Sequence, residues 1–124
     1  MRCPRAVTLL LGVVGLTLGL LGCSQTTQAG PGRVAQVGLS EYRLTPQRLQ
    51  ASAGPLTLVV HNFGHLVHNL AVMRGSRVIE ETAPIAPGSS VTLAVALTPG
   101  RYTLGSNLFD DQSLGAYGTL VVGP

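Results

Sequence analysis

All three histidines of the chain lie within eight positions of one another. They are His61, His65 and His68, and their spacing reads HxxxHxxH. Neutral imidazole is a common ligand of Cu(II) and Zn(II), and carboxylates such as those of Asp110 and Asp111 can complete such a site. The cluster therefore suggests that His68, together with His61 or His65, captures copper or zinc.

A structural role for the same three residues is also open. A strand that ends near His61, followed by a turn at Phe63-Gly64, places His61 and His65 on opposite sides of a hairpin. In that arrangement His65 flanks the turn and is solvated, while His68 is a histidine whose hydrogen bonds are satisfied inside the protein. The sequence leaves both interpretations standing.

Catalytic chemistry is not predicted. Ser106 and His68, with Asp110 or Asp111, are residue types of a hydrolase triad, but residue types without an activated geometry are weak evidence. The acidic pairs Glu80-Glu81 and Asp110-Asp111 are adjacent, and adjacent side chains on an extended strand point to opposite faces. No catalytic residue is assigned, and the chain is not expected to be an enzyme.

The N-terminus has the pattern of an export signal. Arg2 and Arg5 precede an uncharged run over residues 7–21, which is shorter than the roughly twenty residues of a membrane-spanning helix. The run ends in Leu-Leu-Gly-Cys at 20–23, which resembles the lipobox of bacterial lipoproteins, where the cysteine is acylated after cleavage before it. We expect a signal peptide over residues 1–22, lipidation of Cys23 and a domain outside the cytoplasm; cleavage elsewhere, near Ala29, is the alternative.

Composition limits the mature part of the chain further. Residues 23–32 are polar and rich in Gly and Pro, so they are expected to form the lipidated N-terminus and a flexible tether before a domain at 33–124. With Cys3 removed and Cys23 acylated, that domain has no thiol. It has six Arg, five acidic residues and no Lys, a net charge of 6 − 5 = +1. Nucleic acid is not an expected partner, because no basic stripe is present.

Short apolar segments separated by Gly, Pro, Ser and Asn predict β-strands. In residues 90–97 the apolar side chains alternate with others, which indicates a half-buried strand. The expected strand segments are 34–44, 48–51, 56–62, 67–74, 90–97, 101–104 and 118–122. Seven to eight strands without a helix of normal length predict an all-β protein, a Greek-key β-sandwich of two sheets.

Five segments in this order resemble the cupredoxin family of blue-copper proteins. They are YRLTP (42–46), NFGHLVHN (62–69), APGSS (86–90), LTPGRY (97–102) and GTLVV (118–122). The resemblance covers nearly all of the expected domain and implies the cupredoxin-like sandwich. It also implies a copper site of two His and one Cys, usually with a weak axial Met.

Most of those copper ligands are missing here. His68 matches the upstream His ligand, with Asn69 beside it, but the position of the cysteine corresponds to Ser106. The second His should fall within residues 109–112, which are Phe-Asp-Asp-Gln, and the Gly-Met pair corresponds to Gly115-Ala116. No Cys, His or Met follows Met73, so a type 1 copper centre for electron transfer is disfavoured whatever the alignment.

Two functions follow as expectations. The first is a membrane-anchored, non-catalytic binding or accessory module that contacts an envelope protein through Leu66, Leu108, Phe109 and Leu114; the alternative role of these side chains is to cover the core. In this case no cofactor is required. The second is copper or zinc handling at the cell envelope through His68 with His61 or His65.

Overall fold

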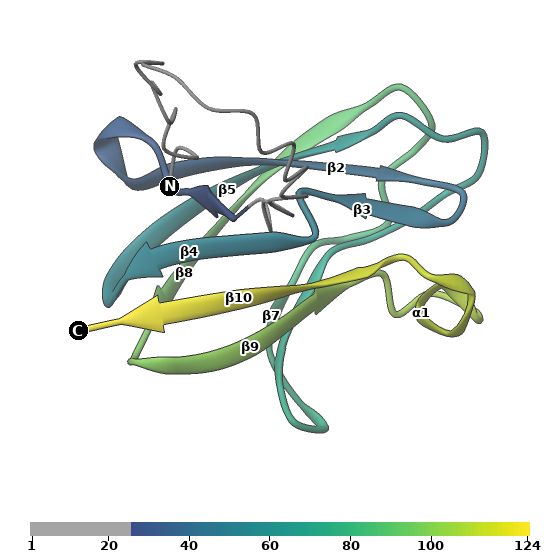
Figure 1. The fold of residues 1–124 in the computed structure, drawn as a ribbon. Coiled ribbons are helices and arrows are strands. Elements are labelled where there is room, and N and C mark those ends of the chain that lie inside the picture. The colour runs from purple at the N-terminus through teal and green to yellow at the C-terminus, as the bar shows by residue number, and fades with distance from the viewer. Residues whose placement is uncertain (1–25) are drawn as a thin grey trace, which may run out of the picture.

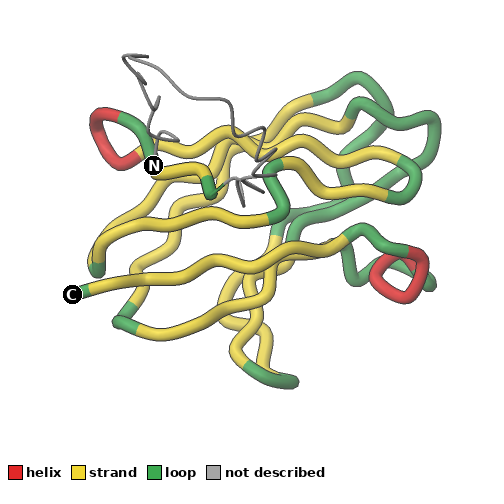
Figure 2. The backbone as a smooth tube through the Cα atoms, viewed as in Figure 1, coloured by secondary structure: helices red, strands yellow, loops and turns green. Residues whose placement is uncertain are grey.

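Two β-sheets packed face to face enclose the core of the protein, and Figures 1 and 2 show them in a computed structural model that describes residues 26–124. The larger sheet has six strands, in the spatial order β1 (Thr27–Gln28), β4 (Arg48–Ser52), β10 (Tyr117–Gly123), β9 (Gly100–Gly105), β6 (Ala71–Arg74) and β7 (Arg77–Glu81). The smaller sheet has four, in the order β3 (Arg43–Thr45), β2 (Val34–Ser40), β5 (Gly54–Asn62) and β8 (Ser90–Leu97). The helical elements are the 3₁₀ turn η1 (Pro31–Arg33) and the single-turn helix α1 (Asp111–Leu114).

Alternation of apolar and polar side chains produces the two layers. In β8, Leu93, Val95 and Leu97 are buried, while the residues between them are exposed. Because successive side chains on a strand point to opposite faces, one face of each sheet is apolar and packs against the other sheet. Leu58 in the middle of β5 and Leu120 in the middle of β10 are fully buried where the two sheets meet.

The all-β sandwich predicted from the sequence is confirmed, but residues 26–124 form ten strands where seven to eight were expected. The segment predicted as one strand over 34–44 is a hairpin of β2 and β3, with a turn between Ser40 and Arg43. The strand β7, which the sequence did not indicate, pairs with β6 through a β-bulge.

The segment predicted as one strand over 67–74 forms a strand only at Ala71–Arg74, and the preceding residues form a loop. That loop is fastened by Asn62, whose side-chain nitrogen donates hydrogen bonds to the carbonyls of Leu66 and Ile85, both at 2.8 Å.

The start of the described chain is packed on the sandwich. Thr27 and Gln28 pair in parallel with Leu49 and Gln50 of β4, and η1 follows. Residues 26–32 therefore contact the domain, although the sequence predicted a flexible tether there. The predicted signal peptide and Cys23 lie outside the described residues. The predicted boundaries at 22/23 and 32/33 stay predictions. Within residues 26–124, no helix is long and apolar enough to cross a bilayer.

Three connections meet at one end of the sandwich, opposite the C-terminus (Figure 1). They are the β2–β3 turn, the β5–β6 loop and the β9–β10 connection with α1, and we call this end the loop end. β5 and β8 pair over eight positions, and β9 and β10 pair over six, which fixes where each connection emerges. The candidate site lies where these connections come together.

Candidate functional site

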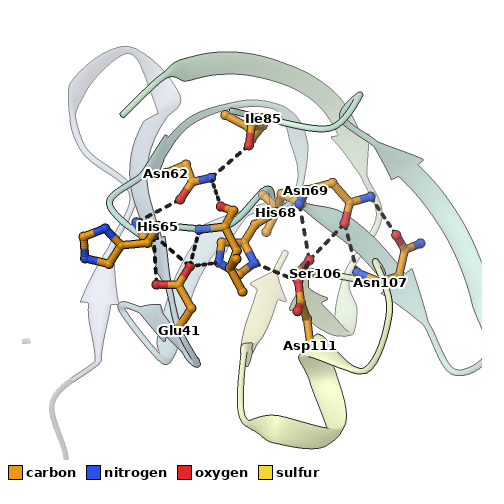
Figure 3. Close-up of polar contacts among 12 residues, drawn as sticks. Glu41, Asn62, His65, His68, Asn69, Ile85, Ser106, Asn107 and Asp111 are labelled. Carbon is orange, nitrogen blue, oxygen red and sulfur yellow. Dashed lines mark hydrogen bonds and ion pairs between the residues drawn. The ribbon is translucent and has the colours of Figure 1, made fainter. Parts of the chain in front are cut away.

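His68 is the centre of a polar network inside the loop end (Figure 3). Its side chain is 0% exposed, and its backbone pairs with Ile85 in an isolated β-bridge. Nδ1 lies 2.7 Å from Oδ2 of Asp111, and Nε2 lies 2.9 Å from Oε1 of Glu41. Both ring nitrogens thus face carboxylates, which accept hydrogen bonds. The arrangement favours the doubly protonated imidazolium, the form in which both nitrogens donate.

Glu41 is held in place by the backbone of the β5–β6 loop. The amides of His65 and Leu66 donate hydrogen bonds to its carboxylate, at 2.9 and 2.7 Å from Oε1. The absence of a side chain at Gly64 leaves room for this carboxylate, because a Cβ added there would lie 2.8 Å from Cδ of Glu41. The amide of His65, followed by that of Leu66 and by His68, lowers the pKa of Glu41 from 4.5 to about 2, against the opposing effect of burial. Glu41 is therefore a carboxylate at neutral pH.

Asp111 is held from the opposite side by the β9–β10 connection. Ser106 donates its hydroxyl hydrogen to Oδ2 of Asp111 at 2.5 Å, and the amide of Ala116 donates to the Asp111 carbonyl at 2.9 Å. The same Ser106 oxygen lies 3.3 Å from the amide nitrogen of Asn69 and accepts its hydrogen bond. Ser106 thus joins the β9–β10 connection to the loop that contains His68.

Asn69 and Asn107 form a second link between these two connections. Nδ2 of Asn69 donates to Oδ1 of Asn107 at 2.6 Å, and the backbone amide of Asn107 donates to Oδ1 of Asn69 at 2.9 Å. Asn107 also donates to a carboxylate oxygen of Glu81 on β7 at 2.9 Å. The loop end is therefore fastened through amide pairs as well as through charges.

The two carboxylates govern the protonation of His68. Burial disfavours the charged imidazolium and acts to lower the pKa. The hydrogen bonds to Asp111 and Glu41 and the attraction of both negative charges outweigh burial, so the pKa of His68 lies above 6.5. A positive charge then sits between two negative charges inside the loop end.

The order of the side chains is unsuited to nucleophilic catalysis. In a hydrolase triad the serine donates to the imidazole, and the carboxylate contacts the far side of the ring. Here Asp111 lies between Ser106 and His68, so the hydroxyl donates to the carboxylate and has no imidazole acceptor. Ser106 is also fully buried. This geometry gives the serine no general base.

The structure does not bring the three histidines together. His61 lies on β5, where its ring nitrogens are each 2.6 Å from a side-chain oxygen, one of Ser90 and one of Gln36, and its ring stacks on Phe63. His65 is exposed, and its ring points away from His68 (Figure 3). Across residues 26–124, no group of three or more His, Cys, Asp or Glu side chains is arranged to hold a metal ion. The copper or zinc site through His68 with His61 or His65 stays a prediction.

Comparison with known proteins identifies the family. The model of the cupredoxin-like domain matches residues 13–122. The chain belongs to the cupredoxin-like domain family. Solved structures with the same fold include an auracyanin from Roseiflexus castenholzii, with 18% identity, a TM-score of 0.69 and coverage of 77% of this chain and 100% of that one. Auracyanin B gives 17% identity, a TM-score of 0.70 and coverage of 82% and 96%.

Another relative is the iron uptake system component EfeO of Yersinia pestis. It is 26% identical over 86 residues, which are 69% of this chain and 23% of EfeO. EfeO from a Yersinia pseudotuberculosis strain is also 26% identical, over 94 residues, which are 76% of this chain and 25% of EfeO. The cupredoxin-like chain therefore spans about a quarter of the length of these relatives.

The residues present do not fit a type 1 copper ion. The thiolate position is taken by the hydroxyl of Ser106, which donates to Asp111 instead of offering a soft sulfur donor. Nδ1 of His68 faces the carboxylate of Asp111, and its other nitrogen faces Glu41 on the far side of the ring. Ala116, at the position of the axial Met, is buried and carries no donor atom in its side chain. The side chains at the expected copper position form hydrogen bonds with one another instead.

Glu41 is the member of the site that the sequence did not reveal. It lies 27 residues before His68 in the chain, and no spacing rule connects an acid in a turn with a histidine so far away. The usable signal is that Glu41 is the first acidic residue of the chain; the structure places it in the turn between β2 and β3. Asp111, in contrast, lies within the window 109–112 in which the sequence placed the second ligand.

We expect the stability of the protein to depend on the charge of His68. Because its pKa is raised on folding, its contribution is fully present below pH 6.5 and is lost as the pH rises through the folded-state pKa. Glu41 acts in the opposite sense: its contribution is present above pH 4.5 and is lost as the pH falls toward about 2. Urea denaturation across this range should show the greatest contribution of the pair between pH 4.5 and 6.5.

Two variants separate His68 from the other histidines. His68→Gln should lower the free energy of unfolding at pH 6.5 by about 3 kcal/mol, since it leaves the buried carboxylate of Asp111 without its cation, and it should abolish the decline at higher pH. His65→Gln, which replaces an exposed side chain, should leave the free energy of unfolding and its decline at higher pH unchanged. A decline at high pH that persists in His68→Gln would contradict this assignment.

We also expect that copper chemistry returns only when the missing ligands are restored. The wild-type chain loaded with Cu(II) should develop no intense blue absorbance, whereas Ser106→Cys with Asp111→His should gain a thiolate-to-copper band, because these changes supply sulfur and imidazole next to His68. The matched control Ser90→Cys with Asp110→His introduces the same residue types outside the network. Blue absorbance from the wild type, or equal absorbance from the control, would refute the assignment of the missing copper ligands to positions 106 and 111.

Proposed function

We propose that this chain is a membrane-anchored, extracytoplasmic binding module that serves an iron uptake system as an accessory component. In this proposal it carries no type 1 copper centre and catalyses no reaction. The observation that carries the proposal is that the position of the copper site is filled by a closed network of hydrogen bonds centred on His68, while apolar side chains remain exposed around it. The network stabilises the loop end, and the apolar side chains are available for contact.

The closed network supports a role other than catalysis. Within the described residues, no buried side-chain nitrogen or oxygen lacks a hydrogen-bond partner. Each ring nitrogen of His68 has a carboxylate, and the Ser106 hydroxyl has Asp111. Groups that already have partners must break these bonds before they engage a ligand, and leaving a buried polar group unpaired is costly. Such a site is suited to holding loops in place.

The exposed side chains at the loop end support a contact surface. Leu66, Phe109 and Leu114 are 51%, 93% and 56% exposed, and with Tyr42 and Val67 they border a hollow of about 420 Å³. Phe109 has a φ of 50°, which is uncommon for a residue with a bulky side chain. Clustered apolar side chains on loop tips often mark protein contacts. Leu108, in contrast, is half-buried.

The EfeO relatives suggest which system this module serves. The chain matches about a quarter of EfeO, which is a component of an iron uptake system. A domain of this size supplies only part of such a component. We therefore infer that it acts by contacting another protein of the system through the apolar side chains at the loop end. We call these side chains the apolar patch: Tyr42, Leu66, Val67, Phe109 and Leu114.

The anchor in this proposal is the acyl group on Cys23. Burying acyl chains contributes about 0.8 kcal/mol per methylene, so two or more chains hold a protein stably on a membrane. The domain would then remain outside the cytoplasm next to the envelope, where a membrane uptake system is within reach. This placement also restricts the search for a partner to proteins of the cell envelope.

The proposal predicts a defect in iron uptake. Cells that lack this chain should accumulate radioactive iron more slowly than wild-type cells at low iron concentration. Expression of the wild-type chain should restore uptake, whereas Phe109→Ser with Leu114→Ser should not, because loss of two apolar anchors of a contact weakens binding by about 2 kcal/mol or more, roughly thirtyfold.

The control is Val78→Ser with Tyr117→Ser, which also removes two exposed apolar side chains but outside the apolar patch. This variant should restore uptake like the wild type. All chains should be present in equal amounts in the membrane fraction and should melt at similar temperatures. Unchanged uptake in cells without the chain would refute the role in iron uptake, and full rescue by Phe109→Ser with Leu114→Ser would refute the role of the patch.

A further inference from the structure

A groove of about 400 Å³ crosses the outer face of the six-stranded sheet, and none of the residues that line it belongs to the network around His68. It is lined by Arg48 and Gln50 of β4, Thr119 of β10, Arg101 of β9 and Thr26 before β1. Thr119 pairs with Arg48, and Val121 pairs with Arg101, so the two arginines lie on either side of β10. The groove therefore presents two guanidinium groups together with hydroxyl and amide groups.

The charged side chains that the four strands of this face carry are both arginines, Arg48 and Arg101. Strands β1, β4, β9 and β10 contain no acidic residue. Arg43 of β3 adds a third guanidinium, since it lines an adjoining hollow together with Arg48. The acidic residues described in the structure lie elsewhere: Glu41, Asp110 and Asp111 are at the loop end, and Glu80 and Glu81 are on β7. Guanidinium groups bind phosphate oxygens well, often through two parallel hydrogen bonds.

The lipid attachment site of the proposed function is close to this groove in the sequence. Thr26 lines the groove, and only three residue steps separate Thr26 from Cys23. An acyl group on Cys23 would therefore leave only a short link between the bilayer and the domain. A short link favours an orientation in which the groove, with Arg48 and Arg101, is near the membrane surface.

We propose that the face formed by β1, β4, β10 and β9 lies against anionic phospholipid headgroups, with Arg48 and Arg101 binding their phosphates. This inference rests on the lipid anchor of the proposed function and adds the orientation of the domain. The four-stranded sheet then faces away from the bilayer, and the apolar patch at the side stays open to a partner. Arginine near an anionic membrane surface contributes about 1 kcal/mol each, and salt screens this attraction.

The experiment measures which face is near the membrane. The lipid-modified mature chain is reconstituted into vesicles that contain phosphatidylglycerol, and a fluorophore is placed on a cysteine introduced either at Ser52 or at Thr92. Ser52 is an exposed residue at the end of β4, and Thr92 is an exposed residue on β8 of the other sheet. Energy transfer to an acceptor on the lipid headgroups should be high from position 52 and low from position 92.

Charge variants test the arginines. Arg101→Gln should reduce about fivefold the equilibrium constant for the orientation in which this face lies against the membrane. Arg48→Gln with Arg101→Gln should reduce the constant further. The matched control Arg77→Gln removes the same charge from β7, outside the face, and should leave energy transfer unchanged. Raising the salt concentration should act like the arginine variants. Equal effects of Arg77→Gln and Arg101→Gln would overturn the proposal.

Two further outcomes identify the source of any failure. Inorganic phosphate should have no more effect than chloride at the same ionic strength; if phosphate alone abolishes the difference, the groove is a site for a small anion and the proposal is overturned. The mass of the purified chain reports acylation of Cys23. An unmodified Cys23 would remove the anchor and this orientation together, while equal energy transfer from both positions in an acylated chain would overturn only the orientation.

Discussion

The loop end depends on the contact of one imidazole with two carboxylates. Glu41 comes from the β2–β3 turn, His68 from the β5–β6 loop and Asp111 from the β9–β10 connection, so this ring joins all three. The blue-copper members of the family join corresponding loops through a metal ion and a thiolate. Here a protonated ring supplies the positive charge, and the hydroxyl of Ser106 occupies the place of the sulfur.

Replacement of copper by side chains changes what the fold can do while the architecture stays the same. The network has no spare buried donor or acceptor among the described residues, and it holds the loops beneath Leu66, Phe109 and Leu114. A surface supported in this way can present apolar side chains in one conformation, which lowers the entropy lost when a partner binds. In our proposal, the outer face of the six-stranded sheet, with Arg48 and Arg101, gives the same domain a second, electrostatic contact. The two surfaces use different strands, so they can act together.

The sequence predicted the fold because alternation in strands such as β8 is strong, and because the motif spacing resembles one family. The resemblance to that family also singled out His68, Ser106 and the window containing Asp111, and the structure brings these three residues together. The sequence did not place Glu41, because the contact joins residues far apart in the chain. It missed the pairing of Thr27–Gln28 with β4, because a two-residue edge strand needs only backbone hydrogen bonds and leaves no apolar pattern.

The protonation of His68 tests the central claim most directly. In the intact folded protein, nitrogen NMR of the ring should show both Nδ1 and Nε2 protonated at pH 6.5, with a pKa above 6.5 for His68 and slow exchange of both ring protons with solvent. Asp111→Asn should lower that pKa. A His68 ring that is neutral at pH 6.5 in the folded wild-type protein would contradict the account, because a neutral imidazole cannot donate to both carboxylates.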